Sequence, residues 1–431
     1  MVLTMFMLAF GYHNDAWRLP NSRSEVVSRL SIISDMAKAA EAAKLHAIFF
    51  ADSNDASTIR QNGVRGLSIY EPVSLMGALI GKTEKLGLVG TASTTFSQPF
   101  SVARQFAGLD LLSDGRIGWN VVTSVSGYQN FGYQAMPDHE FRYRRATEFV
   151  QVVQALWDSW DQDAIVNDRE RGVWVESDRV HDIDHVGEFF TVKGPLNMPR
   201  SPQGRPFIVQ AGQSPAGIEL GASVGDATYT VQPDQAKSIE FYDEYKKIVR
   251  GKGRDPEKVK ILPGIMPIVG ETLGEAEELA ADLANCIDVV AGRAMVARML
   301  KVDISDLELD DKIPLERLVD SGQEWARWKL YRDMAENLTL GGVMIELSRA
   351  VGHRWMIGTP SMIADSMIEW FDNRACDGFN LNPPSVPDGM NSMLTLLVPE
   401  LQERGYFQHE YKGDTLRERI GAELSWTHSP H

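Results

Sequence analysis

The sequence predicts an α/β protein, a (β/α)8 TIM barrel in one domain that spans residues 1–431. Short apolar runs of strand length alternate with amphipathic segments of helix length, which is typical of a parallel sheet built from β-α units. The chain contains eight such runs, and eight strands fit a closed barrel better than an open doubly wound sheet. The extra length forms three insertions, at about 125–142, 161–205 and 286–354, which we expect at the carboxyl ends of the strands.

The elements follow one another along the whole chain. Strands are expected at 5–11, 47–52, 85–94, 116–124, 206–212, 227–231, 260–269 and 378–382. Helices are expected at 25–44, from 72, at 102–112, 143–160, from 215, at 235–249, after Thr272 and at 390–403. Thr272 and Glu275 have the spacing of a capping box. The tail, 425–431, is expected to be disordered.

Composition excludes several classes of protein. The net charge of −16 comes from acids scattered beside bases, so nucleic acid is not expected as a partner. The two cysteines, Cys286 and Cys376, lie far apart, as in a protein from a reducing compartment. The apolar start is too short to span a bilayer and lacks the features of a secretory signal, which favours a cytoplasmic protein without membrane attachment.

Two motifs are rejected on their chemistry. His181 and His185 alternate with acids in a polar insertion that offers no further ligand cluster, so no metal is expected. The run Gly212-Gln213-Ser214 resembles a serine-hydrolase elbow. That turn needs an N–H donor directly after the serine, and Pro215 has none.

Polar residues at the ends of the expected strands are the first site candidates. Asp52 ends an apolar run and is either a solvated loop residue or a site residue. Asn120 is an amide among apolar neighbours and needs a partner if it faces the barrel interior. The hydroxyl run Ser93-Thr94-Thr95 would let a flat ligand approach the backbone, although Thr94 and Thr95 are equally good as strand residues.

Two helix starts are the other candidates. His139 and Tyr143 are four residues apart, so they share a helix face and either reach one ligand together or lie on the surface. Ser214 is placed to cap a helix that begins at Pro215, directly after the strand that ends at Gly212. Such a turn offers backbone N–H groups to an anion, although an ordinary helix cap uses the same residues.

Longer motifs resemble the nitrilotriacetate, EDTA and dibenzothiophene-sulfone monooxygenases of the bacterial-luciferase-like superfamily. The most specific is Trp119-Asn120-Val121-Val122-Thr123-Ser124. The others run in order over nearly the whole chain: Ala16-Trp17-Arg18 after His13, Ala51-Asp52, Ser93-Thr94-Thr95, Asn130-Phe131-Gly132, Asp138-His139 with Arg142-Tyr143, Gln210-Ala211-Gly212 with Ser214-Pro215-Ala216-Gly217, and Gly358-Thr359-Pro360 with Asp377-Gly378-Phe379.

The resemblance implies a two-component, FMN-dependent monooxygenase in which a separate NAD(P)H-dependent flavin reductase supplies reduced FMN. With O2 the flavin forms a peroxide that oxidises a small organic substrate, by C–N or C–S bond cleavage or heterocycle breakdown. Carried over by position, the flavin ring and ribityl chain lie near Asp52, Ser93, Thr94, Thr95, Asn120, His139 and Tyr143, and the phosphate near Gly212 and Ser214.

The family also implies catalytic roles and an assembly. His13 resembles a pocket histidine facing the reacting edge of the flavin, and we expect His13 and His139 to hydrogen-bond or shuttle protons there. The resemblance further implies a homodimer or homotetramer. Two alternatives remain open: an enzyme that degrades flavin itself, and a flavin-binding protein without catalytic activity.

Overall fold

The computed structural model describes the chain except residues 27–28, 57–58, 60–69, 319–325 and 424–431, so the predicted disordered tail lies outside the described residues. Its strands include β1 (Val2–Phe6), β2 (Ala47–Phe50), β3 (Gly87–Ser93), β4 (Ile117–Val122), β9 (Phe207–Gln210), β10 (Ala227–Thr230), β11 (Lys260–Val269) and β13 (Gly378–Leu381). These eight pair in parallel in the order β10-β9-β4-β3-β2-β1-β13-β11, and a β10–β11 pairing closes the sheet. The predicted barrel is confirmed.

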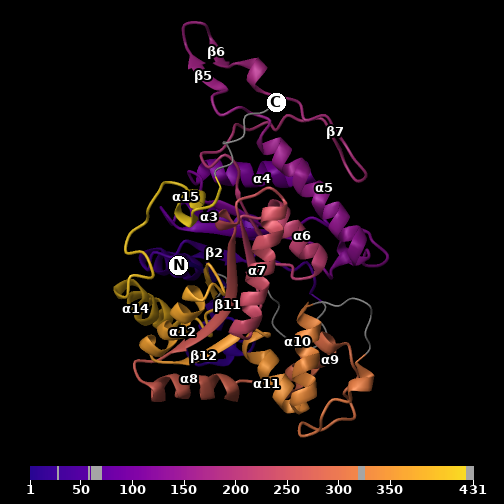
Figure 1. Cartoon of the computed structure of the whole chain (residues 1–431), viewed down its shortest axis with the longest axis vertical. Coiled ribbons are helices and arrows are strands. Elements are labelled where there is room, and N and C mark those ends of the chain that lie inside the picture. Colours follow the sequence, from indigo (N-terminus) through magenta and orange to yellow (C-terminus); the bar gives the residue numbers. More distant parts are fainter. Residues whose placement is uncertain (27–28, 57–58, 60–69, 319–325, 424–431) are drawn as a thin grey trace.

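Helices surround the barrel (Figure 1). They are α1 (Leu30–Ala42), α3 (Pro72–Ile80), α4 (Pro99–Leu112), α5 (His139–Trp157), α6 (Pro215–Val224), α7 (Gln235–Gly251), α8 (Leu273–Asn285) and α12 (Pro360–Asp372). Strand alternation assigns each side chain to a face. On β4, Trp119 packs outward against Phe106 and Phe149, so Asn120 faces the interior. The interior beneath it is filled by Phe49, Tyr229 and other apolar side chains.

The observed elements differ from the expected ones in three places. The first strand ends at Phe6, because the rest of the apolar run forms a buried loop on the 383–386 segment: the Tyr12 N–H donates to the Pro383 carbonyl at 2.6 Å. A ninth strand, β12 (Arg354–Gly358), was not predicted and pairs with the second half of β11. The last helix is split into α13 (Asp388–Ser392), a π-helical segment (Met393–Leu397) and α14 (Val398–Glu403).

Two of the three insertions reach the carboxyl ends of the strands. The first insertion contains a 3-10 turn (Tyr128–Phe131), where Asn130 donates to the Asn54 carbonyl at 2.8 Å beyond β2. The third contains α9 (Val289–Leu300), α10 (Ala326–Asn337) and α11 (Leu340–Ala350), which share their own apolar cluster. The Ser348 carbonyl of α11 accepts from the Asn14 N–H beyond β1. These two insertions therefore border the mouth of the barrel.

The expectation that insertion 161–205 also lies at the carboxyl ends was wrong. It follows helix α5, which returns the chain to the amino ends of the strands. There Gln203 donates to the Ile117 carbonyl at the start of β4 at 2.8 Å. Its hairpin, β5 (Ile165–Asp168) with β6 (Val173–Val175), projects from the end of the molecule opposite α9–α11 (Figure 1). The β5–β6 hairpin therefore lies away from the mouth, whereas the segment between β7 (His185–Val186) and β8 (Thr191–Val192) packs along α5, where Phe189 meets Phe141 edge-on.

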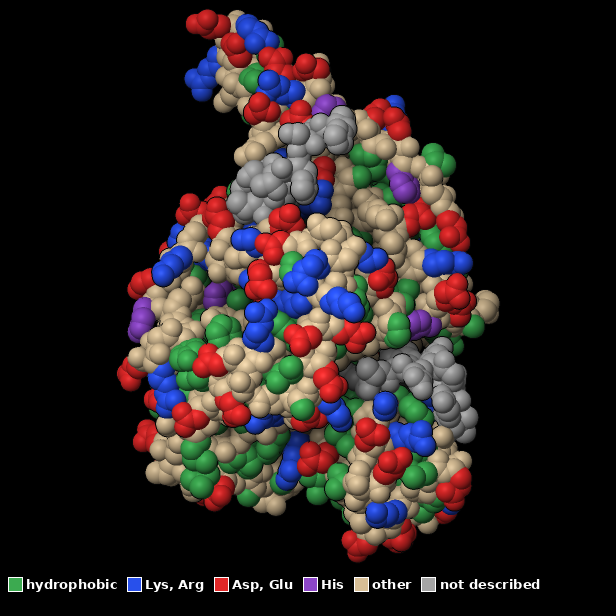
Figure 2. Space-filling model, in the orientation of Figure 1, with side chains coloured by type: hydrophobic (Ala, Val, Ile, Leu, Met, Phe, Trp, Pro, Cys, Tyr) green, Lys and Arg blue, Asp and Glu red, His purple; other side chains and the backbone are tan. Residues whose placement is uncertain are grey.

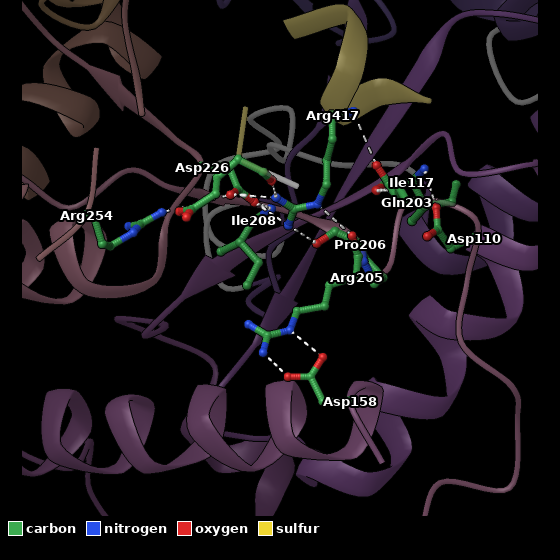
Figure 3. Close-up of polar contacts among 11 residues, drawn as sticks. Asp110, Ile117, Asp158, Gln203, Arg205, Pro206, Ile208, Asp226, Arg254 and Arg417 are labelled. Atoms are coloured by element: carbon green, nitrogen blue, oxygen red, sulfur yellow. Dashed lines mark hydrogen bonds and ion pairs between the residues drawn. The ribbon is translucent and has the colours of Figure 1, made fainter. Parts of the chain in front are cut away.

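A short helix, α15 (Leu416–Ile420), closes the amino end of the barrel. Arg417 is buried and donates to both carboxylate oxygens of Asp226, at 2.8 and 2.7 Å (Figure 3). Asp226 in turn accepts from the Ile208 N–H at 2.8 Å, and Arg417 donates to the Pro206 carbonyl. Polar groups at this end of a TIM barrel stabilise the fold rather than perform chemistry.

The surface is mixed in charge. On the face drawn in Figure 2, acidic and basic side chains are interspersed. No described helix is long and apolar enough to cross a membrane.

Candidate active site

Two helix starts meet at the carboxyl end of β9. Ser214 caps α6 as predicted, because its hydroxyl accepts from the Gly217 N–H at 3.2 Å. His139 is the first residue of α5, and its Nε2 lies 3.3 Å from Ser214 Oγ. The rings of His139 and Tyr143 are 4.6 Å apart between centroids, so they share a face as predicted. The structure thus brings together residues that are about 75 positions apart in sequence.

Gly212 lets neighbouring groups approach its backbone closely. A Cβ atom built on it would lie 2.6 Å from Gln210 Nε2 and 2.8 Å from Tyr143 Oη. It would also lie 3.1 Å from the Gly217 Cα. We call Gly212, Ser214, His139 and Tyr143 the cradle. Positive helix ends beside hydroxyl and imidazole groups are suited to an anion such as a phosphate.

Burial controls the charge of the cradle. It lowers the pKa of His139, and the positive charge of Arg142 lowers it further. The imidazole is therefore neutral at neutral pH, with one nitrogen available as an acceptor. The helix ends, rather than a formal positive charge on His139, supply the positive potential.

Arg142 belongs to one of the motifs quoted above but was given no role from the sequence, and it holds the cradle in place. It is buried, and its Nη1 donates to the carbonyls of Thr123 and Ser124 at 2.6 and 2.9 Å, while Nε donates to the Pro137 carbonyl at 3.0 Å. These bonds tie the start of α5 to the end of β4. A basic residue three positions after His139, on a helix start that follows a strand, was the available signal.

The hydroxyls at the end of β3 differ in what they can still bind. Ser93 Oγ accepts from the Ser124 hydroxyl at 2.8 Å and from the Thr95 N–H at 3.2 Å. Thr94 donates to the Val122 carbonyl at 3.0 Å, which is a structural role. Thr95 Oγ1 is buried and has no hydrogen-bond partner among the described residues. Thr95 is therefore the better candidate for a ligand.

Asn120 presents an acceptor to the interior. Its Nδ2 donates to Thr91 Oγ1 at 2.9 Å, and the Thr91 hydroxyl donates to the Phe50 carbonyl at 2.8 Å. Its Oδ1 is buried and has no hydrogen-bond partner among the described residues. A buried acceptor without a partner costs free energy, so this oxygen is suited to an N–H donor on a ligand.

Asp52 lies beyond β2 at the same end of the barrel. Its carboxylate accepts from the Ser53 N–H at 2.8 Å. Partial burial raises its pKa, which makes the group more readily protonated than a solvated aspartate. The position of Asp52 at the mouth of the barrel is compatible with a role in binding a ligand there.

His13 is fully buried on another side of the mouth. It follows β1, its N–H donates to the Pro384 carbonyl at 3.2 Å, and its Nδ1 accepts from the Asp15 N–H at 3.2 Å. In the barrel, β1 is separated from β4 by two strands. The predicted site residues therefore form a group at β9 and α5, a group at β2–β4, and His13 at β1 and β13.

The sequence motif with His181 and His185 does not form a metal centre. His181 pairs with Asp161 at 3.1 Å, and His185 pairs with Glu148 at 3.0 Å. Among the described residues, no three His, Cys, Asp or Glu side chains are grouped as metal ligands.

A parallel barrel with an anion cradle and an orphaned polar group at its carboxyl end is the architecture of a cofactor-dependent TIM-barrel enzyme. A family model described as luciferase-like monooxygenase matches residues 5–375. The chain belongs to this family. Its membership confirms the prediction that it is a flavin-dependent monooxygenase.

Known relatives cover almost the whole chain. It is 41% identical over 426 residues to the N-acetyl-S-(2-succino)cysteine monooxygenase of Bacillus subtilis (strain 168), covering 98% of this chain and 96% of that protein. It is 38% identical to nitrilotriacetate monooxygenase component A of Aminobacter aminovorans, covering 95% and 94%. A solved riboflavin lyase, with modified FMN and riboflavin, superimposes with a TM-score of 0.86 at 29% identity, covering 98% and 96%. The predicted resemblance is confirmed.

Proposed function

We propose that this chain is the oxygenase component of a two-component system that uses reduced FMN and O2 to oxidise a small organic substrate. A separate NAD(P)H-dependent flavin reductase supplies the reduced FMN. The observation that carries the proposal is the cradle: the N-termini of α5 and α6 converge there, with Ser214 Oγ 3.3 Å from His139 Nε2 and the Tyr143 ring beside His139. The word "component" in the name of the nitrilotriacetate relative supports the separate reductase.

The residues present fit FMN. The N-terminus of α6 and the Ser214 hydroxyl would hold the phosphate, with His139 and Tyr143 beside it. The unpartnered Asn120 Oδ1 would accept from the N–H of the flavin ring. Asp52 and a hydroxyl among Ser93, Thr94 and Thr95 would bind the ring or the ribityl chain.

Reduced FMN, when bound, supplies the electrons that activate O2. The protein's part is to exclude water and to orient the substrate. Buried His13 would hydrogen-bond at the reacting edge of the ring. Neutral His139 would hold a proton at Nε2, the atom that faces Ser214, and hydrogen-bond the phosphate there, whereas its predicted role at the ring edge stays a prediction.

The relatives suggest the bond that is broken. Nitrilotriacetate has C–N bonds, and N-acetyl-S-(2-succino)cysteine has C–S bonds between its carboxylated parts. We propose oxidative cleavage of a C–N or C–S bond, or heterocycle breakdown, as the reaction. A second candidate is cleavage of flavin itself, which the similarity to the riboflavin lyase favours. Membership in a monooxygenase family argues against a flavin-binding protein without activity.

Titration with oxidised and reduced FMN, followed by reductase-coupled O2 uptake, tests the proposal. The compounds to supply are N-acetyl-S-(2-succino)cysteine, nitrilotriacetate, dibenzothiophene sulfone and riboflavin, with product masses recorded. Oxygen incorporation that requires reductase and FMN supports it, and riboflavin turnover alone selects the flavin-degrading function. Absence of FMN binding to the wild-type protein refutes it. The homodimer or homotetramer and the cytoplasmic location stay predictions, and light scattering measures the first.

A further inference from the structure

Asn382 is a buried amide that faces the barrel interior at its carboxyl end. On β13, Phe379 and Leu381 pack outward in the main core, so Asn380 and Asn382 point inward. Asn382 is 1% exposed, and its Nδ2 has no hydrogen-bond partner among the described residues. A Cβ atom built on the facing Gly264 would lie 3.0 Å from this nitrogen. The absence of a side chain at Gly264 therefore leaves room for the amide.

A chain of hydrogen bonds determines which end of the amide is presented. Tyr229 bonds to Thr4, and the Thr4 hydroxyl donates to Asn380 Oδ1 at 2.8 Å. Asn380 Nδ2 donates in turn to Asn382 Oδ1 at 3.5 Å. Burial raises the pKa of Tyr229, so its phenol stays protonated beside Thr4. With Oδ1 engaged, Asn382 Nδ2 is left as a donor toward the mouth.

The surroundings of Asn382 are distinct from the cradle. His353 also stands over Gly264, because a Cβ there would lie 2.3 Å from His353 Nδ1. The His353 ring packs edge-on against Tyr12, at 5.4 Å between centroids. In the barrel β13 neighbours β1, and it is separated from β9 by β1–β4 in one direction and by β11 and β10 in the other. Asn382 thus lies with His13, across the mouth from the cradle.

An unpaired buried donor selects its ligand. Leaving it unmatched costs the desolvation of the N–H, whereas an oxygen acceptor recovers that cost. A site built to bond one polar group rejects analogues that lack it more strongly than an apolar pocket rejects a change of size. An alkane or dialkyl sulfide would leave Asn382 Nδ2 without a partner.

We propose that Asn382 is a positioning residue whose Nδ2 binds an oxygen acceptor on the organic substrate, such as a carbonyl, carboxylate or sulfonyl oxygen. This rests on the proposed function, because it assigns the β1–β13 side of the mouth to the substrate and the β9 side to the FMN phosphate.

Two probes of one shape test the assignment. Acetophenone has a carbonyl oxygen where α-methylstyrene has a methylene group. Both are soaked into FMN-loaded crystals of the wild type, Asn382→Leu and Asn382→Asp, and their affinities are compared in solution by saturation-transfer NMR. We expect the acetophenone oxygen at hydrogen-bond distance from Asn382 Nδ2, and a preference for acetophenone that falls about tenfold in Asn382→Leu.

The variants separate binding from folding. Asn382→Asp keeps the shape and removes the donor once the carboxyl group is ionised, so it should lose the preference at a pH above the pKa of that group. Asn391→Leu, the same change at an exposed residue, should keep it. Affinity for FMN should be equal in all four proteins.

If FMN binds to the wild type, the proposed function stands, and any of three results would overturn the inference about Asn382. In the first, the acetophenone oxygen lies away from Asn382 or the probe is absent from the mouth. In the second, the preference is unchanged in Asn382→Leu. In the third, an FMN atom occupies the position beside Nδ2. Failure of FMN to bind to the wild type would instead refute the proposed function.

Discussion

Replacing Ser214 by alanine should weaken FMN binding more than it weakens the fold. The hydroxyl accepts from the Gly217 N–H at 3.2 Å and lies 3.3 Å from His139 Nε2. Loss of an N-cap hydroxyl costs about 1 kcal/mol of stability. Loss of one hydrogen bond to a charged phosphate costs roughly 1.5–3 kcal/mol. The dissociation constant for FMN should therefore rise roughly tenfold to a hundredfold.

A matched cap elsewhere on the molecule separates the two effects. Thr272 caps α8 in the same way, because its hydroxyl accepts from the Glu275 N–H at 3.3 Å on the outside of the barrel. Thr272→Ala should lower the thermal midpoint about as much as Ser214→Ala and leave FMN affinity unchanged. Riboflavin, which lacks the phosphate, should bind the wild type and Ser214→Ala equally.

The assay is fluorescence titration with FMN and riboflavin on the three proteins. An equal loss of affinity for both flavins in Ser214→Ala would place the ring, rather than the phosphate, at the cradle. Unchanged FMN affinity would show that the cradle does not hold the phosphate at all, and the reasoning from the helix end would fail.

Three further predictions concern the site and the fold. His139→Asn should fold normally and uncouple NAD(P)H consumption from substrate oxidation. More hydrogen peroxide should then form per NAD(P)H consumed in the reductase-coupled assay. A normal ratio of product to NAD(P)H would remove His139 from the proton-handling role. Arg417→Met leaves Asp226 buried without its main partner, and urea unfolding should show a loss of about 3–5 kcal/mol. Burial lowers the pKa of His46 from 6.5 to about 4. Stability should therefore fall by about 3 kcal/mol as the pH drops from 6.5 to 4, a loss absent from His46→Gln.

The sequence predicted the barrel well because the residue pattern that indicates each strand or helix lies within that element. Each strand is a short apolar run, and each helix is capped or periodic within its own segment. The errors came where tertiary contacts decide the structure. The apolar residues after Phe6 are buried by the 383–386 loop rather than by strand pairing. Strand β12 exists because β11 extends beyond the barrel and offers it an edge.

The candidate site was predictable in its parts more than in its arrangement. Spacing placed His139 and Tyr143 on one face, and the Ser-Pro pair predicted the cap of α6. Neither observation could show that the two helices meet, because that depends on β4 and β9 being neighbours in the barrel. The role of Arg142 was likewise hidden, since its acceptors are main-chain carbonyls that any sequence would supply.

The position of insertion 161–205 depends on which element precedes it in the chain and not on the length of the insertion. A segment that follows a strand emerges at the carboxyl ends, whereas one that follows a helix emerges at the amino ends. Residues 161–205 follow α5, and Arg205 accordingly meets Asp158 beside the Arg417 network (Figure 3). We therefore expect substrate selection by the first and third insertions and by interior residues such as Asn382. A substrate-range change is expected from exchanging these segments, and not from exchanging the β5–β6 hairpin.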